Sequence, residues 1–448
     1  MTGWRDQMTS IVAPAVARSA AIDEIVVESG ALAALPGLFA RRFPGTSAFL
    51  VADENTFAAA GAQAARALEA AGLRVAAHVL PAAPRPKPRR DLGDALARAV
   101  PEGATPLAVG SGVVNDLVKY AAYVRGLPYL CVATAASMDG YSSAGSPLVD
   151  QGFKKTIPCA PPRVILADLD VISRAPAAMA GWGYGDLAGK APAGGDWLVA
   201  DALGIEPIDD VAWPLVQDNL ASWLSQPEAV AAGDPDATAA LFMGLTVSGL
   251  AMEAHGSSRP ASGADHQIAH VWEMEDLQHG GERVSHGACV AIGALDALAL
   301  FDWLIAQDLA GLDAERIVAA APSLAAKRAE IARAFPEAAI AERAVAETAA
   351  KHLDPAAHRA RLEAIRAAWP DLRARLRERL PRMPEMRQRL AAAGAPTSAA
   401  AIGVDPARHR ATIRASRLIR SRYTILDLLD ETGLLEPALD AILPETGA

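Results

Sequence analysis

The first third of the chain alternates short apolar runs with helical patterns, and this alternation restricts the fold more than any other feature. The runs SAFLVAD, LRVAAHVL, PLAVG, PYLCVAT and RVILAD each read as a strand that ends in a polar or glycine-containing turn. The stretches between them carry apolar residues at helical spacing, as in TFAAAGAQAARALEAAG, which ends at Gly72. Strands that alternate with helices predict a parallel sheet with helices on both faces.

The pattern changes near residue 173. From there, long stretches rich in alanine and leucine predict helices, and no strand is evident. At 448 residues the chain is long enough that two cores are expected. We therefore predict an α/β domain over residues 1–172 and an all-helical domain over residues 173–448.

Composition and charge narrow the class of protein. The net charge of −10 argues against nucleic acid as a partner, because phosphate backbones need a basic face. The three cysteines form no pair motif, which is typical of a reducing compartment. No signal peptide is evident, and no stretch reads as apolar enough for long enough to span a bilayer. We expect a soluble cytoplasmic protein without membrane insertion.

Three polar loops follow predicted strands. Gly110, Ser111 and Gly112 separate a strand from a helix, where backbone N–H groups bind phosphate, and Asp116 lies on the first turns of that helix. Asp53 ends an earlier strand, where an acid bonds a ribose hydroxyl or, equally well, caps a helix. The loop TAASMDGYSSAG (residues 134–145) follows a third strand. The carboxyl ends of parallel strands share one edge, so these loops predict a nucleotide site that includes Asp53 and Asp116.

Histidines concentrate in one short segment. GADHQIAHVWEMEDLQHGGERVSHG (residues 263–287) holds several of the nine histidines of the chain, and His255 lies just upstream. His266 and His270 share one face of a helix, and His286 opens a later helical run. Two imidazoles and a carboxylate bind a divalent cation. The spacing leaves that carboxylate open among Asp265, Glu273, Glu275, Asp276, Glu282 and the more distant Asp186. His255 and His279 read as structural or surface residues.

Six ordered motifs resemble a known family. VADENT, GSGVVNDLVKYAA, TAASMDGYSS, GYGDLAGK, GSSRPASGADHQIAH and SHGACVAIG, within residues 51–293, are similar to the sn-glycerol-1-phosphate dehydrogenases. That family belongs to the group that holds iron-containing alcohol dehydrogenases, glycerol dehydrogenase and dehydroquinate synthase. The resemblance implies a Rossmann-like sheet domain, an all-α carboxyl-terminal domain and an active site in the cleft between them.

The resemblance also implies roles for individual residues. It selects Asp186, His266 and His286 as the metal ligands. It makes Asp186 and His270 catalytic, and Asp139, Asp186 and His270 contacts of the substrate. The implied cofactor contacts are Gly110, Ser111, Gly112, Val113 and Val114 at the pyrophosphate, with Thr134, Ser137 and Ser143 nearby. Two departures from the family pattern are Ser111, where many relatives have glycine, and the segment DLAGKAPAGGDW.

The implied reaction is reversible hydride transfer between NAD(P)H and dihydroxyacetone phosphate, giving sn-glycerol 1-phosphate. It uses one divalent metal, for which zinc, nickel and iron all fit the ligands and zinc is preferred. The family also implies a role in phospholipid biosynthesis, and we expect a homo-oligomer. The alternatives are a glycerol or other polyol dehydrogenase, or a non-catalytic nucleotide-binding protein on this scaffold. Candidate contacts of the substrate phosphate are Lys154, Lys155 and Arg259.

Overall fold

A computed structural model describes residues 3–150 and 153–443. The chain forms two compact units, each built from more than one stretch of sequence. The first holds residues 1–187, 214–257 and 392–394, and the second holds residues 188–213, 258–391 and 395–448. Sheet structure gives way to helices after residue 168, close to the expected boundary at 172/173. The first compact unit nevertheless contains, besides the sheet, several helices that follow residue 173 in the chain.

The first unit contains a six-stranded sheet in the order β1-β8-β5-β4-β2-β3, and every pairing in it is parallel. The predicted parallel sheet is therefore confirmed. Its strands are β1 (Glu24–Glu28), β2 (Ser47–Asp53), β3 (Val75–Leu80), β4 (Ala104–Gly110), β5 (Leu130–Ala133) and β8 (Val164–Asp168).

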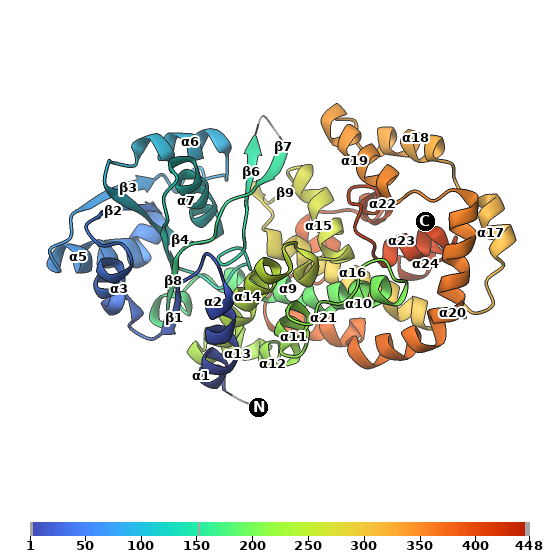
Figure 1. The fold of residues 1–448 in the computed structure, drawn as a ribbon, viewed down its shortest axis with the longest axis horizontal. Coiled ribbons are helices and arrows are strands. Elements are labelled where there is room, and N and C mark those ends of the chain that lie inside the picture. Colours follow the sequence, from blue (N-terminus) through green and yellow to red (C-terminus); the bar gives the residue numbers. More distant parts are fainter. Residues whose placement is uncertain (1–2, 151–152, 444–448) are drawn as a thin grey trace. The chain divides into compact units, whose positions relative to one another are not determined.

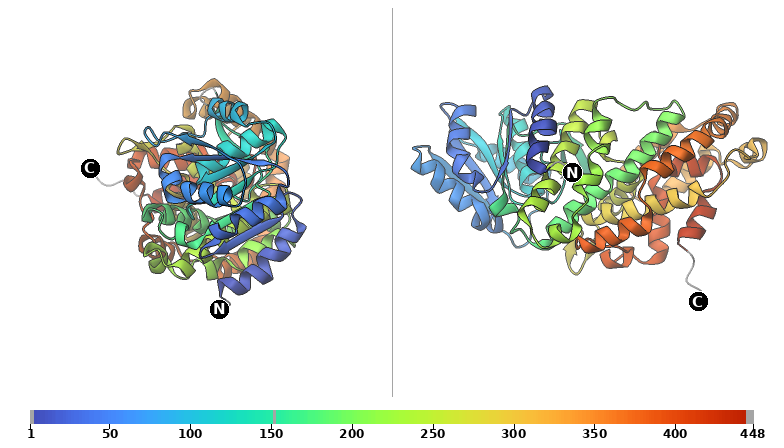
Figure 2. Two further views of the ribbon diagram at one scale, coloured as in Figure 1. Left: turned by 90° about the vertical axis from the view of Figure 1, so that its left-hand side faces the viewer. Right: turned by 90° about the horizontal axis from the view of Figure 1, so that it is seen from below.

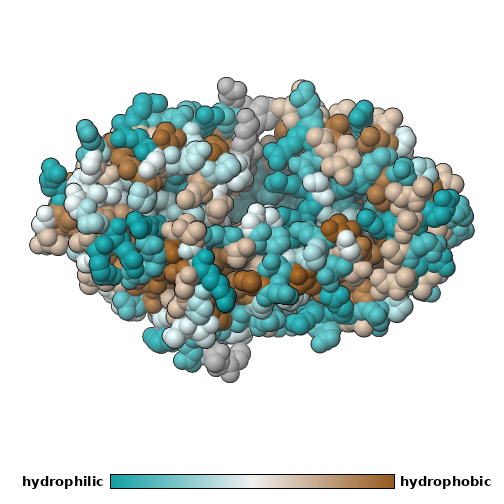
Figure 3. Space-filling model, viewed as in Figure 1, coloured by the Kyte–Doolittle hydropathy of each residue, from teal (hydrophilic) through white to brown (hydrophobic). Residues whose placement is uncertain are grey.

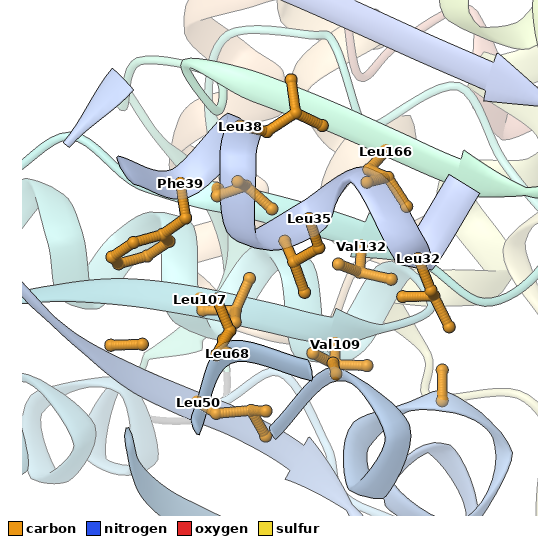
Figure 4. Packing of buried hydrophobic residues seen from close by; sticks show 14 of the residues in the cluster. Leu32, Leu35, Leu38, Phe39, Leu50, Leu68, Leu107, Val109, Val132 and Leu166 are labelled. Carbon is orange, nitrogen blue, oxygen red and sulfur yellow. The ribbon is translucent and has the colours of Figure 1, made fainter. Parts of the chain in front are cut away.

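Helices cover both faces of this sheet (Figures 1 and 2). On one face lie α3 (Leu35–Arg42) and α5 (Ala62–Ala70), and on the other lie α6 (Arg90–Ala99) and α7 (Gly112–Arg125). Alternate strand residues such as Leu107 and Val109 point toward α3 and α5, because side chains on a strand alternate between faces. Figure 4 shows Leu35, Phe39 and Leu68 packed over them.

The remaining elements of the first unit are mostly helical. They are α1 (Trp4–Gln7), α2 (Ala13–Arg18), α4 (Glu54–Thr56), α8 (Leu169–Ile172), α9 (Ala177–Ala188), α12 (Leu220–Trp223), α13 (Pro227–Ala231), α14 (Pro235–His255) and the hairpin of β6 (Ser146–Asp150) and β7 (Phe153–Ile157). The sequence did not reveal β1 or this hairpin. Both are short, and neither carries a long buried run of the kind that marks the inner strands.

The second unit is mostly helical. Its helices are α10 (Lys190–Ala202), α15 (Ala264–Met274), α16 (His286–Ile305), α17 (Ala314–Ala320), α18 (Leu324–Ala334), α19 (Ala338–Lys351), α20 (Pro355–Arg379), α21 (Met383–Ala392), α22 (Pro406–Ser416), α23 (Ile425–Glu431) and α24 (Leu435–Ile442), and α11 (Ala212–Gln217) joins the two units in sequence. The expectation of no strand here needs one correction, a hairpin of β9 (Gln278–His279) and β10 (Glu282–Arg283). Gly280 and Gly281 adopt positive φ in its turn, and two-residue strands leave no periodicity to read.

Two helices, α14 and α16, are long and apolar enough to cross a membrane by length and composition, contrary to the expectation from sequence. Of the apolar window of each, 78% is buried inside the protein. Both are accordingly core helices, α14 of the first unit and α16 of the second. On the face drawn in Figure 3, hydrophobic residues lie in separate groups among hydrophilic ones.

A buried polar pair ties α22 to α16 in the second unit. Nε2 of His409 lies 2.7 Å from Oδ2 of Asp296, and the Trp272 ring lies 6.0 Å from the His409 ring. Burial lowers the pKa of His409, but the hydrogen bond and charge of Asp296 outweigh that effect and leave the pKa above its ordinary value. The protonated imidazole is thus held by the fold.

We predict that His409 stabilises the protein most at low pH. A histidine with a raised folded pKa contributes fully below its unfolded pKa, about 6.5, and loses that contribution as the pH rises through the folded value. The unfolding temperature of His409→Gln should therefore approach that of the wild type as the pH rises above about 6.5. Thermal unfolding followed by circular dichroism measures the difference.

His352→Gln is the matched control. Burial, with the charges of Lys327 and His358, lowers the pKa of His352, so its effect on the unfolding temperature should have the opposite pH trend. A His409→Gln deficit that grows with pH would contradict the assignment.

Candidate functional site

The turn between β4 and α7 is built for close approach of the backbone. Gly110 ends the strand, and a Cβ there would overlap the Val114 side chain. Ser111 caps the helix with φ −90°, the negative value that a serine tolerates at this position. Its side chain makes no cap hydrogen bond. The first N–H groups of α7, including those of Val113 and Val114, therefore lack a side-chain cap, as in anion-binding turns.

Asp53 has a structural role as well as a predicted one. It caps the short helix α4: Oδ1 accepts from the Thr56 N–H at 2.8 Å, and Oγ1 of Thr56 accepts from the Asp53 N–H at 3.0 Å. This capping box is the structural alternative that the sequence left open. The ribose contact of Asp53 stays a prediction.

The parallel topology brings the three predicted loops to one edge of the sheet. β4 pairs with β2 on one side and with β5 on the other, so the loops that follow these strands are neighbours. Asp53 and Gly110 are the last residues of β2 and β4, and the loop over residues 134–145 directly follows β5. Ligands of parallel sheets bind beyond such ends.

A buried lysine holds the third loop. Nζ of Lys119, on α7, donates to the carbonyl oxygens of Gly140 at 2.8 Å, Ser143 at 2.8 Å and Gly145 at 3.1 Å. Burial lowers the pKa of Lys119, and the nearby charge of Asp116 opposes that lowering. The sequence assigned no role to Lys119. The structure makes it the residue that joins the glycine turn to the loop.

The same loop packs tightly against two helices of the first unit. A Cβ at Gly183 of α9 would overlap the carbonyl oxygen of Ala136, and one at Gly249 of α14 would overlap Oγ of Ser142. Oγ of Ser142 also donates to the Thr246 carbonyl at 2.6 Å. Glycines are therefore required on both helices. The predicted cofactor contacts of the loop differ in burial: Thr134 and Ser137 are buried, and Ser143 is half-buried.

The loop meets α9 at the two predicted acidic residues. Oδ2 of Asp186 accepts a hydrogen bond from the backbone N–H of Asp139 at 2.9 Å. Asp186 is fully buried, and Asp139 is half-buried. The structure therefore brings together the two aspartates that the resemblance assigned to the substrate.

The three histidines that the resemblance assigned to metal or substrate lie on α15 and at the first position of α16. Nδ1 of His266 bonds Oδ2 of the buried Asp265, and Nδ1 of His286 lies 2.8 Å from Oε1 of Glu273. A carboxylate on one ring nitrogen orients the other, Nε2, for a metal. Asp265 and Glu273, two of the open carboxylate choices, thus serve as partners of the histidines.

The spacing of these two rings fits a shared cation. The ring centroids of His266 and His286 are 5.3 Å apart. Two imidazoles on one tetrahedral ion, with nitrogens about 2.1 Å from it, hold their centroids about 5 Å apart. The chemistry of this donor pair therefore fits the divalent metal that the motifs imply.

A second group of donors overlaps the first. One ligand atom from each of His270, Glu273 and His286 lies within 4.8 Å of the others. The His270 and His286 rings are stacked with centroids 6.1 Å apart. Because Glu273 already bonds Nδ1 of His286, we expect it to orient that histidine and to leave metal binding to the other nitrogen.

Other open candidates of the segment have structural partners. Glu275 pairs with Arg408 at 2.6 Å, and Asp276 pairs with Arg283 at 3.2 Å. The His279 ring packs where a Cβ on Gly403 would stand. His255 is half-buried, and its Nδ1 lies 2.9 Å from the Ser257 hydroxyl.

A buried aspartate in α10 sets the start of α15. The two carboxylate oxygens of Asp196 accept from the backbone N–H groups of Ala264 and Ile425, both at 2.6 Å. Burial raises the pKa of Asp196 to about 7, against the effect of these bonds. Asp196 lies in the segment that departs from the family pattern, and the sequence assigned it no role. It anchors the turn that begins two residues before His266.

Of the candidate phosphate contacts, the side chains of Lys154 and Lys155 lie outside the described residues. Arg259 is fully buried, donates to the carbonyls of Tyr423 and Asp196, and pairs with Glu206 at 3.3 Å. It therefore has a structural role.

The fold is that of the iron-containing alcohol dehydrogenase type. The family model for iron-containing alcohol dehydrogenase matches residues 26–176. Glycerol dehydrogenase from Schizosaccharomyces pombe shares the fold at a TM-score of 0.57 and 16% identity, over 95% of this chain and 94% of that one. Maleylacetate reductase from Agrobacterium tumefaciens does so at 0.58 and 16%, over 95% and 98%.

Relatives in sequence identify the family more narrowly than the family model and the solved structures do. Glycerol-1-phosphate dehydrogenase [NAD(P)+] from Bacillus subtilis is 34% identical over 61% of this chain and 70% of its own length. The enzyme of that name from Thermofilum pendens is 32% identical over 63% and 80%. The one from Halalkalibacterium halodurans is 35% identical over 56% of this chain, which covers 64% of that relative. The chain therefore belongs to the glycerol-1-phosphate dehydrogenase family. It spans less than two thirds of the length of the Halalkalibacterium relative.

We predict that Lys119→Met loosens the loop over residues 134–145. Hydrogen bonds to charged groups contribute about 1.5–3 kcal/mol each, so losing them should speed amide exchange in the loop by about tenfold or more. Hydrogen–deuterium exchange read by mass spectrometry measures this rate.

Arg125→Met is the matched control on the same helix. Nη1 of Arg125 donates to the carbonyls of Ala97 and Val100, both at 3.0 Å, away from the loop. This variant should leave exchange in the loop unchanged. Equal loop exchange in wild type and Lys119→Met would refute the role of Lys119.

Proposed function

We propose that this chain is a metal-dependent sn-glycerol-1-phosphate dehydrogenase that transfers a hydride reversibly between NAD(P)H and dihydroxyacetone phosphate. The observation that carries the proposal is the pair His266 and His286, each bonded through Nδ1 to a carboxylate, in a chain of this family. Membership of the family supports the substrate, and the histidine pair supports the metal.

We propose Asp186, His266 and His286 as the metal ligands. Asp186 comes from the first unit and the histidines from the second. Zinc suits two imidazoles and a carboxylate, and nickel and iron suit them nearly as well. When bound, the cation would supply Lewis acidity, and the dinucleotide would supply the hydride-transfer chemistry.

The chain's own residues orient the histidine ligands and the substrate, and one of them transfers the proton of the substrate hydroxyl. Asp265 and Glu273 hold the two imidazoles in one tautomer. We assign His270 the hydrogen bond to the substrate hydroxyl and the transfer of its proton, with Glu273 Oε2 3.9 Å from Nε2 of that ring. Asp139 is the further substrate contact, held against Asp186 through its backbone N–H.

We propose that the glycine turn receives the pyrophosphate and that NAD is preferred to NADP. Asp53 repels a 2′-phosphate. The basic loop after β3 offers little compensation, because Arg89 pairs with Asp91, Arg90 pairs with Asp150, and Arg85 lies over the Trp182 ring at 5.7 Å. A cytoplasmic location and a homo-oligomer belong to the same proposal. The buried thiols of the three cysteines support a reducing compartment.

We predict that His266→Ala and His286→Ala each lose bound metal together with turnover, because each removes one imidazole ligand. His270→Ala should keep the metal and lose rate. Metal content by mass spectrometry and initial rates measure the two effects separately.

The three histidine variants distinguish the donor group that contains His266 from the group that contains His270. Loss of metal from His270→Ala as complete as from His266→Ala would transfer metal binding to the group of His270, Glu273 and His286. Wild-type rates in a protein without bound metal would refute the metal proposal altogether.

The substrate is tested by oxidation assays on the metal-supplemented protein with sn-glycerol 1-phosphate, sn-glycerol 3-phosphate and glycerol, each with NAD and NADP. We expect the highest kcat/KM for sn-glycerol 1-phosphate with NAD. Faster oxidation of glycerol would make the protein a polyol dehydrogenase. Tight binding of NAD without metal-dependent turnover would make it a nucleotide-binding protein.

A further inference from the structure

Two arginines lie next to each other beside the start of α15. Arg259 is the fully buried one, and its guanidinium is committed to two carbonyls and to Glu206. The second is Arg422, in the turn between α22 and α23. Burial, together with the positive charge of Arg259, lowers the pKa of Arg422 to about 10.

The Arg422 guanidinium donates to two neutral groups. Nη1 donates to the carbonyl of Ser262 at 2.8 Å, and Nη2 donates to the hydroxyl of Ser258 at 3.0 Å. Among the described side chains, no carboxylate lies within 4.0 Å of its guanidinium. Glu206 and Asp265 act on it only through longer-range charge, and each has its own basic or imidazole partner.

The position of Arg422 relates it to the reaction site. Its backbone carbonyl accepts from Nε2 of Gln267 at 3.3 Å, and Gln267 directly follows His266 on α15. Ser262, which Arg422 bonds, lies just before the same helix. The arginine is thus held against the helix turn that carries a proposed metal ligand.

We propose that the Arg422 guanidinium, with the Ser258 hydroxyl, binds a phosphate monoester, the phosphate of the substrate. This inference rests on the proposed function for the identity of the ligand. A half-buried guanidinium without a carboxylate partner offers its remaining N–H groups to a dianion, and its planar fork matches two phosphate oxygens. Ser258 is exposed, accepts from Arg422 through its oxygen, and has a hydroxyl proton to donate to the same anion.

The test compares Arg422→Gln with Arg420→Gln in the metal-loaded holoenzyme. Arg420 lies in the same turn and is also a buried cation, but it faces Arg343 and Glu347. Arg422→Gln should raise KM for sn-glycerol 1-phosphate by about 10- to 100-fold while KM for NAD stays near the wild-type value. Arg420→Gln should leave both constants unchanged.

A second readout does not need turnover. Inorganic phosphate, titrated by calorimetry with NADH saturating the dinucleotide site, should bind the wild type and Arg420→Gln. Its affinity for Arg422→Gln should be at least about tenfold weaker. If Arg422→Gln does not fold, Arg422→Lys keeps the charge without the fork and should show a smaller rise in KM.

The outcomes separate this inference from the proposed function. An active wild type with unchanged KM and phosphate affinity in Arg422→Gln overturns the subsite and leaves the function standing. An equal loss in Arg420→Gln overturns it as well, because the effect would then be one of the turn as a whole. A wild type inactive on glycerol phosphate whose phosphate binding depends on Arg422 overturns the function and retains the anion site.

Discussion

The candidate site of the first unit depends on the hydrogen bonds that the buried Lys119 side chain donates. Its three hydrogen bonds hold the loop over residues 134–145 against α7, the helix that begins at the glycine turn. Glycines on α9 and α14 allow those helices to approach the same loop. With its backbone held on three sides, the loop presents the Asp139 N–H to the Asp186 carboxylate. A charge buried at some cost in desolvation thus determines where two acidic groups lie.

In the second unit, hydrogen bonds to carboxylates orient the histidines, as the hydrogen bonds of Lys119 hold the loop in the first unit. Asp196 holds the start of α15, while Asp265 and Glu273 each bond one imidazole. Buried carboxylates need such donors, because an unpaired charge in the interior is costly. The polar groups of the core are therefore also the groups that set the orientation of His266 and His286.

Several parts of the structure follow from local patterns. The inner strands of the sheet were predicted because each is an apolar run that ends in a polar or glycine-containing turn. The helices that end at Gly72 and Gly126 were predicted because apolar residues at helical spacing lead up to a glycine. The edge strand β1 and the two hairpins were not, because each is short or only partly buried. Lys119 and Asp196 escaped prediction for another reason. A lysine or an aspartate in a helical stretch looks like a surface residue until its burial is known.

The amino-acid sequence alone determined the fold class, the glycine turn, the family motifs and the set of histidines from which metal ligands come, since all of these are encoded in local spacing. Tertiary structure decided which carboxylate serves which group. Asp265 and Glu273 lie as near to the histidines in sequence as any ligand, yet they bond Nδ1 of His266 and His286. It also showed that Arg259 is committed to the interior, while Arg422, more than 150 residues later, has no carboxylate partner among the described side chains. Partner choice depends on distance and burial in three dimensions, and one-dimensional spacing carries neither.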